Sequence, residues 1–352
     1  MEKVTIVLTG GGTAGHIMPN IALIDELKKH FDNIYYIGTN GMEKDIVKSN
    51  NIPFFEIKAY KFTRKLSPKL FLLPFRVLYS INQAKKVLKK LRPNVIFSKG
   101  GYVSIPVAIA GKKLDIPVVT HESDLTLGLA NKIIAKYSKF VCLSFYSEKY
   151  KNKKFVCTGS PIRKEIFSGN AQNVLKNIDF NKNLPNLLFV GGSLGAKAIN
   201  DFVTFNLDEL TKKYNILHIT GKNYPQKTHK NYKSVPFAPN IQDYFACADI
   251  VISRSGANTI FELCAIEKPM LLIPLPKGNS RGDQVENAKY FEQKHLCYML
   301  EQKDLNIQNL TTYIDKTLKN KQTFIKNMHI LSIKNANKRI VDIILSCVKR
   351  EK

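Results

Sequence analysis

The 352-residue sequence contains few acidic residues. Asp and Glu total 28 against 54 Lys and Arg, so the formal net charge is +26 at pH 7. A charge of this size indicates an acidic partner: a nucleic acid, an anionic membrane or a phosphorylated substrate. Only eight of the basic residues are Arg. Because biased codon usage would also enrich Lys, the charge bears on function only where it is localised.

Long apolar runs, paired cysteines and Asp-x-Asp motifs are also missing. No stretch reaches the ~18 apolar residues that a transmembrane helix needs, and the amino terminus does not resemble a secretory signal. The six cysteines form no C-x-x-C pair, so we expect free thiols in a reducing cytoplasm rather than a zinc site or disulfides. Without Asp-x-Asp to hold a metal-diphosphate, we expect no metal and no obligatory cofactor.

The hydrophobic content and its pattern along the chain predict an α/β protein. Hydrophobic residues make up 44% of the chain, which excludes a disordered protein. Short apolar runs alternate with helical patterns, which indicates parallel sheets covered on both faces. The first half predicts strands at 4–9, 34–37, 95–98, 118–121 and 140–143, and helices at about 19–30, 70–91, 105–113 and 129–137.

The same pattern restarts after a polar stretch near residues 160–186. It predicts strands at 187–190, 216–220, 249–253 and 270–273, and helices at about 196–214, 258–266 and 285–294. We therefore expect a domain of residues 1–160 and a second domain of residues 161–333. A final helical segment, 334–352, is expected to pack back on the first domain.

Three glycine-containing turns join strands to helices and carry the chemistry. Gly10–Gly15 satisfies G-x-G-x-x-G, but the next strand ends without the carboxylate that a dinucleotide ribose requires, which argues against NAD. Gly191–Ala196 repeats the turn in the second domain, and Ser255–Ala257 provides a third. Helix amino termini after such turns bind phosphate groups, so the two domains are expected to meet phosphates on both sides of a cleft.

Seven segments, taken together and in order, resemble the MurG family, the peptidoglycan N-acetylglucosaminyltransferases of the GT-B superfamily. They are TGGGTAGHIMPN (9–20), SKGGYVSIP (98–106), THESDLTLGLANK (120–132), TGSPIR (158–163), GGSLGAK (191–197), SRSGANTIFEL (253–263) and DQVENA (283–288). The resemblance implies two doubly wound, Rossmann-like domains facing a deep cleft.

It further implies an inverting transfer of N-acetylglucosamine from UDP-N-acetylglucosamine to the C4 hydroxyl of lipid I. This acceptor is undecaprenyl-diphospho-N-acetylmuramoyl-pentapeptide, and the product is lipid II for peptidoglycan synthesis, on which cell shape and division depend. The second domain would bind the donor and the first domain the acceptor.

The resemblance also assigns roles residue by residue. Glu262 would bind the ribose, Ile241 the uracil, and Gln284 with Asp283 the sugar, while Arg163 would stabilise the leaving diphosphate. The donor site as a whole would comprise Thr13, Ala14, Gly15, His16, Asp124, Arg163, Ser193, Ile241, Ala257, Asn258, Thr259, Glu262, Asp283 and Gln284. The acceptor diphosphate would meet Gly12, Thr13, His16, Gly101 and Tyr102.

Two residues compete for the role of general base. An imidazole titrates near neutral pH and needs little tuning to accept a proton, so His16 ranks first and Glu122 second. A purely phosphate-binding His16 remains an alternative, and for His121 a structural hydrogen bond is favoured over catalysis. Family members often carry Asn-Gly after His-Glu-Gln. Here Asp124 and its neighbours stand instead, which puts the contacts of that Asn in doubt.

The charge is localised between residues 57 and 114, where 14 basic residues and no acidic ones occur. An apolar run lies inside this window, and an apolar patch with basic flanks is typical of an interfacial membrane site. The candidate membrane contacts are Lys69, Leu70, Phe71, Leu72, Phe75 and Arg76. A core helix with a lysine-rich polar face is the alternative. We expect a peripheral protein on the cytoplasmic face of the bacterial plasma membrane, with other cell-wall synthesis or division proteins as possible partners.

Two other functions compete with this interpretation. Another GT-B transferase with a UDP-sugar donor and a lipid acceptor, such as a diacylglycerol glucosyltransferase, would share most of these motifs. A nucleic-acid binder would share the charge, but no binding module or stacking pattern of aromatics is present. We therefore expect no nucleic-acid partner.

Overall fold

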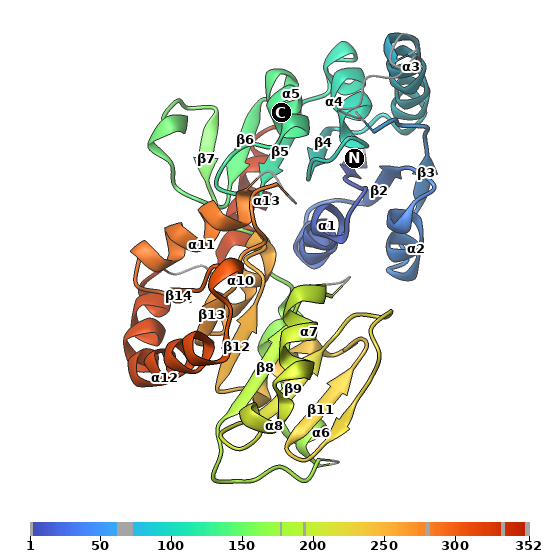
Figure 1. Cartoon of the computed structure of the whole chain (residues 1–352). Coiled ribbons are helices and arrows are strands. Elements are labelled where there is room, and N and C mark those ends of the chain that lie inside the picture. Colours follow the sequence, from blue (N-terminus) through green and yellow to red (C-terminus); the bar gives the residue numbers. More distant parts are fainter. Residues whose placement is uncertain are drawn as a thin grey trace. The chain divides into compact units, whose positions relative to one another are not determined.

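Strands and helices alternate along the chain in two successive sets. The computed structural model describes residues 3–61, 73–176, 178–192, 195–278, 282–331 and 335–348. The chain divides into two compact units: unit 1 comprises residues 1–163 with 334–352, and unit 2 comprises residues 164–333. Figure 1 labels the elements of both units.

The described residues of unit 1 form a parallel sheet with the strand order β3-β2-β1-β4-β5-β6-β7. Its strands are β1 (Thr5–Thr9), β2 (Asn33–Gly38), β3 (Phe54–Glu56), β4 (Val95–Ser98), β5 (Val118–Glu122), β6 (Phe140–Leu143) and β7 (Phe155–Cys157). The order reverses at β1, which pairs with β2 on one side and β4 on the other. This is the switch point at which doubly wound sheets bind ligands.

Helices cover both faces of this sheet. They are α1 (Ala14–Leu27), α2 (Met42–Ser49), α3 (Leu73–Leu91), α4 (Ser104–Lys113), α5 (Leu129–Tyr137) and α13 (Ala336–Leu345), with a short 3-10 turn η2 (Glu148–Tyr150). Because side chains alternate along a strand, Ile6 and Leu8 of β1 enter a core with α1, α2 and α13. Val7 enters a second core with α3, α4 and α5. Figure 1 shows α3, α4 and α5 on one side of these strands and α1 and α2 on the other.

The last helix, α13, completes the first of these cores. Ile340, Val341 and Ile344 are fully buried there. The side chain of Asn337 donates to the carbonyls of Ile162 (2.8 Å) and Ala22 (2.9 Å), and its oxygen accepts from the Ile162 N–H (2.9 Å). One amide thus joins α13, α1 and the chain segment that follows β7.

Unit 2 repeats the topology. The order of its described strands is β10-β11-β9-β8-β12-β13-β14, and only the β10–β11 pair is antiparallel. The strands are β8 (Asn186–Val190), β9 (Asn215–Ile219), β10 (Thr228–His229), β11 (Tyr232–Val235), β12 (Ile250–Ser253), β13 (Met270–Leu272) and β14 (Tyr298–Met299). Here the order reverses at β8, between β9 and β12.

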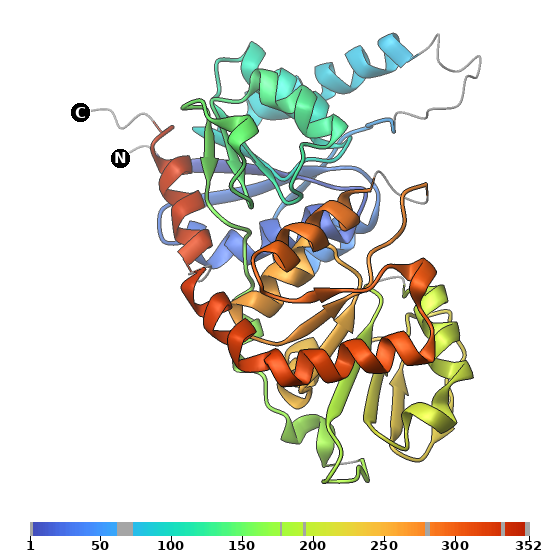
Figure 2. The same ribbon diagram turned by 60° about the vertical axis from the view of Figure 1, so that its left-hand side comes forward.

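The helices of unit 2 bury one apolar core around α7, α8 and α12. The helical elements are η3 (Lys164–Ser168), α6 (Gln172–Leu175), α7 (Lys197–Phe205), α8 (Leu207–Leu210), α9 (Ile241–Cys247), α10 (Ala257–Ala265), α11 (Asp283–Gln293), η4 (Gln302–Asp304) and α12 (Ile307–Ile330). α10 and α11 meet through the edge-to-face rings of Phe261 and Phe291. The long orange-red helix α12 is seen along its length in Figure 2.

The predicted parallel sheets are confirmed, but several boundaries were wrong. α1 begins at Ala14, ahead of Pro19, because the glycine turn starts the helix and the proline lies inside it. The single helix predicted at 196–214 breaks at Asn206, whose side chain bonds the Phe202 carbonyl (2.7 Å) and competes with the backbone. The polar stretch at 160–186 contains η3 and α6. For the helix predicted at 70–91, residues 70–72 lie outside the described residues.

Candidate active site

The loops that follow β1 and β4 touch each other at the switch point of unit 1. A Cβ on Gly101 would lie 2.4 Å from the Gly11 carbonyl oxygen, and Gly101 also has a φ of +80°. A Cβ on Gly12 would lie 2.8 Å from the ring of Tyr102. Only glycine fits either position without displacing a neighbour. The structure therefore brings together the predicted acceptor residues of both loops.

His16 lies in the first turn of α1 and points toward the loop after β4. Its Nδ1 lies 3.2 Å from the carbonyl oxygen of Lys99. A carbonyl can only accept, so Nδ1 carries the proton in this contact and Nε2 carries the lone pair. The side chain is half-buried. A histidine with a fixed tautomer is suited to accept a proton from a hydroxyl group.

A buried carboxylate that the sequence analysis missed anchors the first glycine loop. Glu43, in the first turn of α2, accepts hydrogen bonds from the Gly12 N–H (3.4 Å), the Thr39 N–H (3.0 Å) and the Thr39 hydroxyl. The second strand itself ends without a carboxylate. The acid lies four residues beyond Thr39, and it binds the loop itself. Its partner Gly12 is 31 residues away in sequence, and no local pattern signals such a pairing.

Glu122, the competing base, is occupied by its own loop. One oxygen accepts from the Asp124 N–H (3.1 Å), and the other accepts from the Gly128 N–H (2.9 Å) and the Asn131 amide (2.9 Å). These bonds connect the end of β5 to the start of α5. Glu122 therefore shapes the loop of residues 123–128, and the geometry favours His16 as the base.

His121 is fully buried, one residue before Glu122. Its Nε2 donates to the Gly159 carbonyl (2.9 Å), and its Nδ1 has no partner among the described residues. Burial lowers the pKa of this imidazole well below its usual value, and the nearby Lys99 ammonium lowers it further. A neutral, inaccessible ring fits the structural role favoured for His121.

In the sequence, Lys99 is one of the 14 basic residues of the acid-free window and lies in the segment SKGGYVSIP, without a role of its own. Its side chain is 1% exposed, and its ammonium donates to the hydroxyl of Ser123. Burial lowers the pKa of Lys99 to about 8, while Glu122 and Asp124 oppose the fall. Composition alone could not distinguish this buried cation from a surface lysine.

In unit 2, the amino termini of α10 and α11 lie together near the switch point. The hydroxyl of Ser255 donates to the Gln284 carbonyl (2.8 Å), and the Asn287 amide donates to the Ser255 carbonyl (3.3 Å). The first turn of α10 contains Ala257, Asn258 and Thr259, and α11 begins at Asp283. The amino terminus of α10 has no acid in its first turn and offers N–H donors and positive potential to an anion, whereas Asp283 and Glu286 offset that potential at α11.

Gln284 and Arg254 set the loop that follows β13. The Gln284 side-chain oxygen accepts from the Leu275 N–H (3.0 Å), which fixes the side chain against this loop. Arg254 donates to the carbonyls of Ile273 and Pro274 (3.1 Å each) and to Gln302 (2.6 Å), and burial lowers its pKa. Arg254 lies in the segment SRSGANTIFEL, and the sequence alone indicates no role for it. In the structure, Arg254 holds the backbone of Ile273 and Pro274 and the side chain of Gln302 together.

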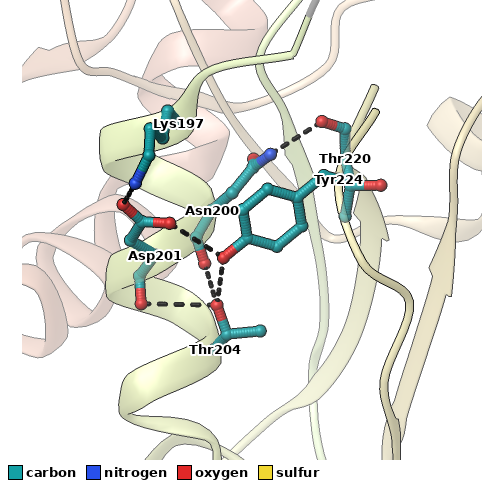
Figure 3. A network of polar contacts seen from close by, with 6 residues as sticks. All are labelled: Lys197, Asn200, Asp201, Thr204, Thr220 and Tyr224. Atoms are coloured by element: carbon teal, nitrogen blue, oxygen red, sulfur yellow. Dashed lines mark hydrogen bonds and ion pairs between the residues drawn. The ribbon is translucent and has the colours of Figure 1, made fainter. Parts of the chain in front are cut away.

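A polar network fixes α7 against the end of β9, as Figure 3 shows. The Asn200 amide donates to the Thr220 carbonyl (2.7 Å), and the Tyr224 hydroxyl contacts Asp201 (3.0 Å) and Thr204 (2.7 Å). A Cβ on Gly195 would lie 2.1 Å from the same Thr220 carbonyl. Gly195 therefore packs tightly against the end of β9, and the predicted Ser193 lies outside the described residues.

The remaining predicted donor residues are distributed over both units. Glu262 is half-buried in the second turn of α10, and Ile241 is the first residue of α9. Thr13, Ala14, Gly15 and Asp124 lie at the carboxyl edge of the unit 1 sheet. Arg163 is the last residue of the first stretch of unit 1. The structure brings the α10 and α11 residues together within unit 2.

The predicted membrane contacts fall on α3 and the segment before it. Phe75 is 70% exposed, and Leu78 and Tyr79 are also exposed, while the guanidinium of Arg76 lies 5.2 Å from the Tyr60 ring centroid. Lys69, Leu70, Phe71 and Leu72 lie outside the described residues. In the described part of the chain, every helix is too short or too polar to cross a membrane.

A cavity of about 530 Å³ lies at the other end of the unit 1 sheet. Asn94, Pro117 and Lys139, which precede β4, β5 and β6, line it together with Cys347. It is therefore at the amino edge, away from the glycine loops. Among the described residues, no group of three or more His, Cys, Asp or Glu side chains is placed to hold a metal ion.

Two Rossmann-like units, each with glycines in the turn after its central strand, define a protein of the GT-B fold class. Solved structures agree with this fold. The glycosyltransferase of kitacinnamycin covers 99% of this chain and 100% of its own at a TM-score of 0.75, with 11% identity. MurG from Acinetobacter baumannii covers 98% of this chain and 100% of its own at a TM-score of 0.74, with 25% identity.

The chain belongs to glycosyltransferase family 28. Residues 6–142 match the N-terminal domain of that family and residues 186–343 its C-terminal domain. A relative from Clostridium botulinum (strain Alaska E43) is 45% identical over 99% of both chains. One from Clostridium tetani is 44% identical over 97% of this chain and 98% of its own. Both are named UDP-N-acetylglucosamine--N-acetylmuramyl-(pentapeptide) pyrophosphoryl-undecaprenol N-acetylglucosamine transferase.

Proposed function

We propose that this chain transfers N-acetylglucosamine from UDP-N-acetylglucosamine to the C4 hydroxyl of undecaprenyl-diphospho-N-acetylmuramoyl-pentapeptide, in peptidoglycan synthesis. The acceptor oxygen attacks the anomeric carbon as the bond to UDP breaks, and the hydroxyl proton passes to a base. A single displacement inverts the anomeric centre and gives a β-1,4 link. Identity of 44–45% over almost the full length to relatives of that name supports the choice of substrates. The geometry of His16 is the observation that supports the chemistry.

Unit 1 acts on the acceptor. His16 accepts the hydroxyl proton at Nε2, because Nδ1 is committed to the Lys99 carbonyl. Thr13, Gly101 and Tyr102 offer backbone N–H groups to the acceptor diphosphate, and Gly12, whose N–H is bonded to Glu43, lets the backbone approach it closely. Glu122 does not compete as base, because its oxygens already accept three hydrogen bonds.

Unit 2 binds the donor. The first turn of α10 and Arg163 stabilise the charge that develops on the leaving diphosphate. Glu262 binds the ribose hydroxyls, Gln284 and Asp283 bind the sugar, and Ile241 offers backbone groups to uracil. Thr13, Ala14, Gly15, Asp124 and Ser193 complete the proposed donor contacts. No metal or obligatory cofactor is part of this proposal.

Turnover of UDP-N-acetylglucosamine with a lipid I analogue tests the proposal, with UDP-glucose as the control donor. Preference for UDP-glucose would favour a different lipid glycosyltransferase. His16→Ala should lower kcat by about a hundredfold or more while UDP binding persists. His30→Ala, at an exposed histidine just beyond the same helix, is the matched control. Near-normal kcat in His16→Ala would exclude His16 as the general base.

We further propose that α3 and the segment before it bind the cytoplasmic face of the plasma membrane. The exposed Phe75 beside Arg76 supports this, because apolar and basic side chains together favour an anionic interface. Other cell-wall synthesis or division proteins are candidate partners at the same membrane, and nucleic acid is not.

Vesicle binding tests the membrane proposal. Phe75→Ser with Arg76→Glu should release the protein from phosphatidylglycerol vesicles while turnover with a soluble acceptor survives. Phe205→Ser, which changes a 90% exposed phenylalanine in unit 2, should leave vesicle binding unchanged. Equal vesicle binding by the α3 variant and the unchanged protein would refute the proposed membrane contact of α3.

A further inference from the structure

The fully buried lysine at the carboxyl edge of the unit 1 sheet has no part in the reaction described above. Lys99 follows β4 directly and is 1% exposed. Lysine is almost never buried to this degree unless its charge is paired. Its ammonium donates to Ser123, in the loop that Glu122 shapes. The side chain thus ties the end of β4 to the loop after β5.

The backbone of the same residue reaches two further elements. Its N–H donates to the Thr9 carbonyl at the end of β1 (2.9 Å), and its carbonyl accepts from His16 Nδ1 (3.2 Å). Lys99 therefore contacts β1, α1 and the loop of residues 123–128 through three different groups.

The peptide plane that carries the Lys99 carbonyl is held from both sides. After Lys99, the Gly100 N–H donates to the Ser98 hydroxyl (3.1 Å), and the Gly100 carbonyl accepts from the Ser104 hydroxyl (2.8 Å). Before it, the N–H and the anchored side chain of Lys99 fix the residue itself. A change that frees the ammonium removes one of these restraints on the acceptor that orients His16.

We propose that Lys99 is a positioning residue for the transfer reaction, which orients His16 through its carbonyl because its buried ammonium anchors it to the loop of residues 123–128. This inference rests on the proposed function. Lys99 is too buried to touch substrate, so it acts only through His16 and the loop.

The charge of Lys99 gives the proposal a pH signature. Glu122 on β5, Asp124 in the following loop and Cys142 on β6 favour its charged form, and burial opposes it, so its pKa lies near 8. The neighbouring His121 stays neutral, and His16 faces the backbone rather than the ammonium. Above this pH the anchor loses its charge, and kcat should fall.

Lys99→Met tests the inference, because methionine fills the space without a charge. We expect kcat to fall about tenfold or more, the donor KM to stay within about twofold, and the fall in kcat above pH 8 to disappear. Ser123→Ala, which removes the hydroxyl that accepts from the Lys99 ammonium, should lower kcat in the same direction. Lys113→Met, at an exposed lysine of α4, is the matched control.

Unchanged kcat and an unchanged pH profile in Lys99→Met would overturn the inference. A readout independent of turnover separates it from the proposed function. The ¹⁵N shifts of the His16 ring should show the Nδ1–H tautomer in the unchanged protein and a mixture of tautomers in Lys99→Met. If the unchanged protein transfers no sugar but the tautomer shifts as expected, the proposed function fails and the positioning role stands. An identical tautomer in both proteins would refute the positioning role.

Discussion

The same substitution, Lys99→Met, should raise the stability of the protein while it lowers activity. On folding, the pKa of Lys99 falls from 10.5 to about 8, chiefly because of burial. A tenfold change in proton affinity is worth about 1.4 kcal/mol, so folding with this side chain charged costs about 3 kcal/mol near pH 7. Lys99→Met removes this cost but also loses the hydrogen bond to Ser123, which reduces the expected gain in stability by about 1 kcal/mol.

The sign of the pH dependence follows from the lowered pKa. Between pH 8 and 10.5 the unfolded chain binds the Lys99 proton more tightly than the folded chain, so stability rises with pH in this window. The cost is complete below pH 8 and disappears as the pH approaches 10.5. The stability difference between Lys99→Met and the unchanged protein should therefore shrink by about 2 kcal/mol between pH 7 and about pH 9.5.

Urea unfolding followed by circular dichroism at several pH values measures this difference. Lys113→Met controls for the loss of a positive charge at the surface and should show a pH-independent difference. A Lys99→Met protein that is less stable than the unchanged one by the same amount at every pH would refute the reasoning. In that case attraction to Glu122 and Asp124 would outweigh the cost of burial.

Three further substitutions test other parts of the structure. Glu43→Gln replaces a carboxylate that accepts three hydrogen bonds and should lower the free energy of unfolding by about 1–3 kcal/mol; unchanged urea unfolding would contradict the anchor. Glu262→Ala should raise the KM for UDP-N-acetylglucosamine about tenfold or more with little effect on stability, and an unchanged KM would exclude the ribose contact. Asn337→Ala removes three hydrogen bonds and should lower the melting temperature and speed proteolysis of α13; equal proteolysis would contradict its role.

The sequence predicted the central strands and the glycine turns well for a physical reason. Strands such as Leu187–Val190 are buried on both faces and therefore appear as continuous apolar runs. The edge strands β7, β10 and β14 have two or three residues each, too few to form a pattern. The turns could be predicted from the sequence because Gly101 and Gly195 lie where no side chain fits, so glycine is required there.

The supporting polar residues could not be predicted in the same way. Glu43 binds a loop 31 residues away, and Lys99 reaches a loop 24 residues away. Each pairing exists only because the parallel sheet aligns the carboxyl ends of strands that are distant in sequence. The sequence shows that residue 99 is a lysine, but only the fold shows that its side chain is buried away from water.

The path of the chain has a consequence for biosynthesis. Unit 1 is built from both ends of the polypeptide, and α13 supplies Ile340, Val341 and Ile344 to its core. A ribosome synthesises all of unit 2 before it releases these residues. The first unit to begin synthesis therefore completes its core only after unit 2 has been synthesised, and a nascent chain exposes the apolar faces of α1 and β1 until α13 follows. A chain truncated after residue 333 should accordingly have a protease-sensitive unit 1 and a protected unit 2.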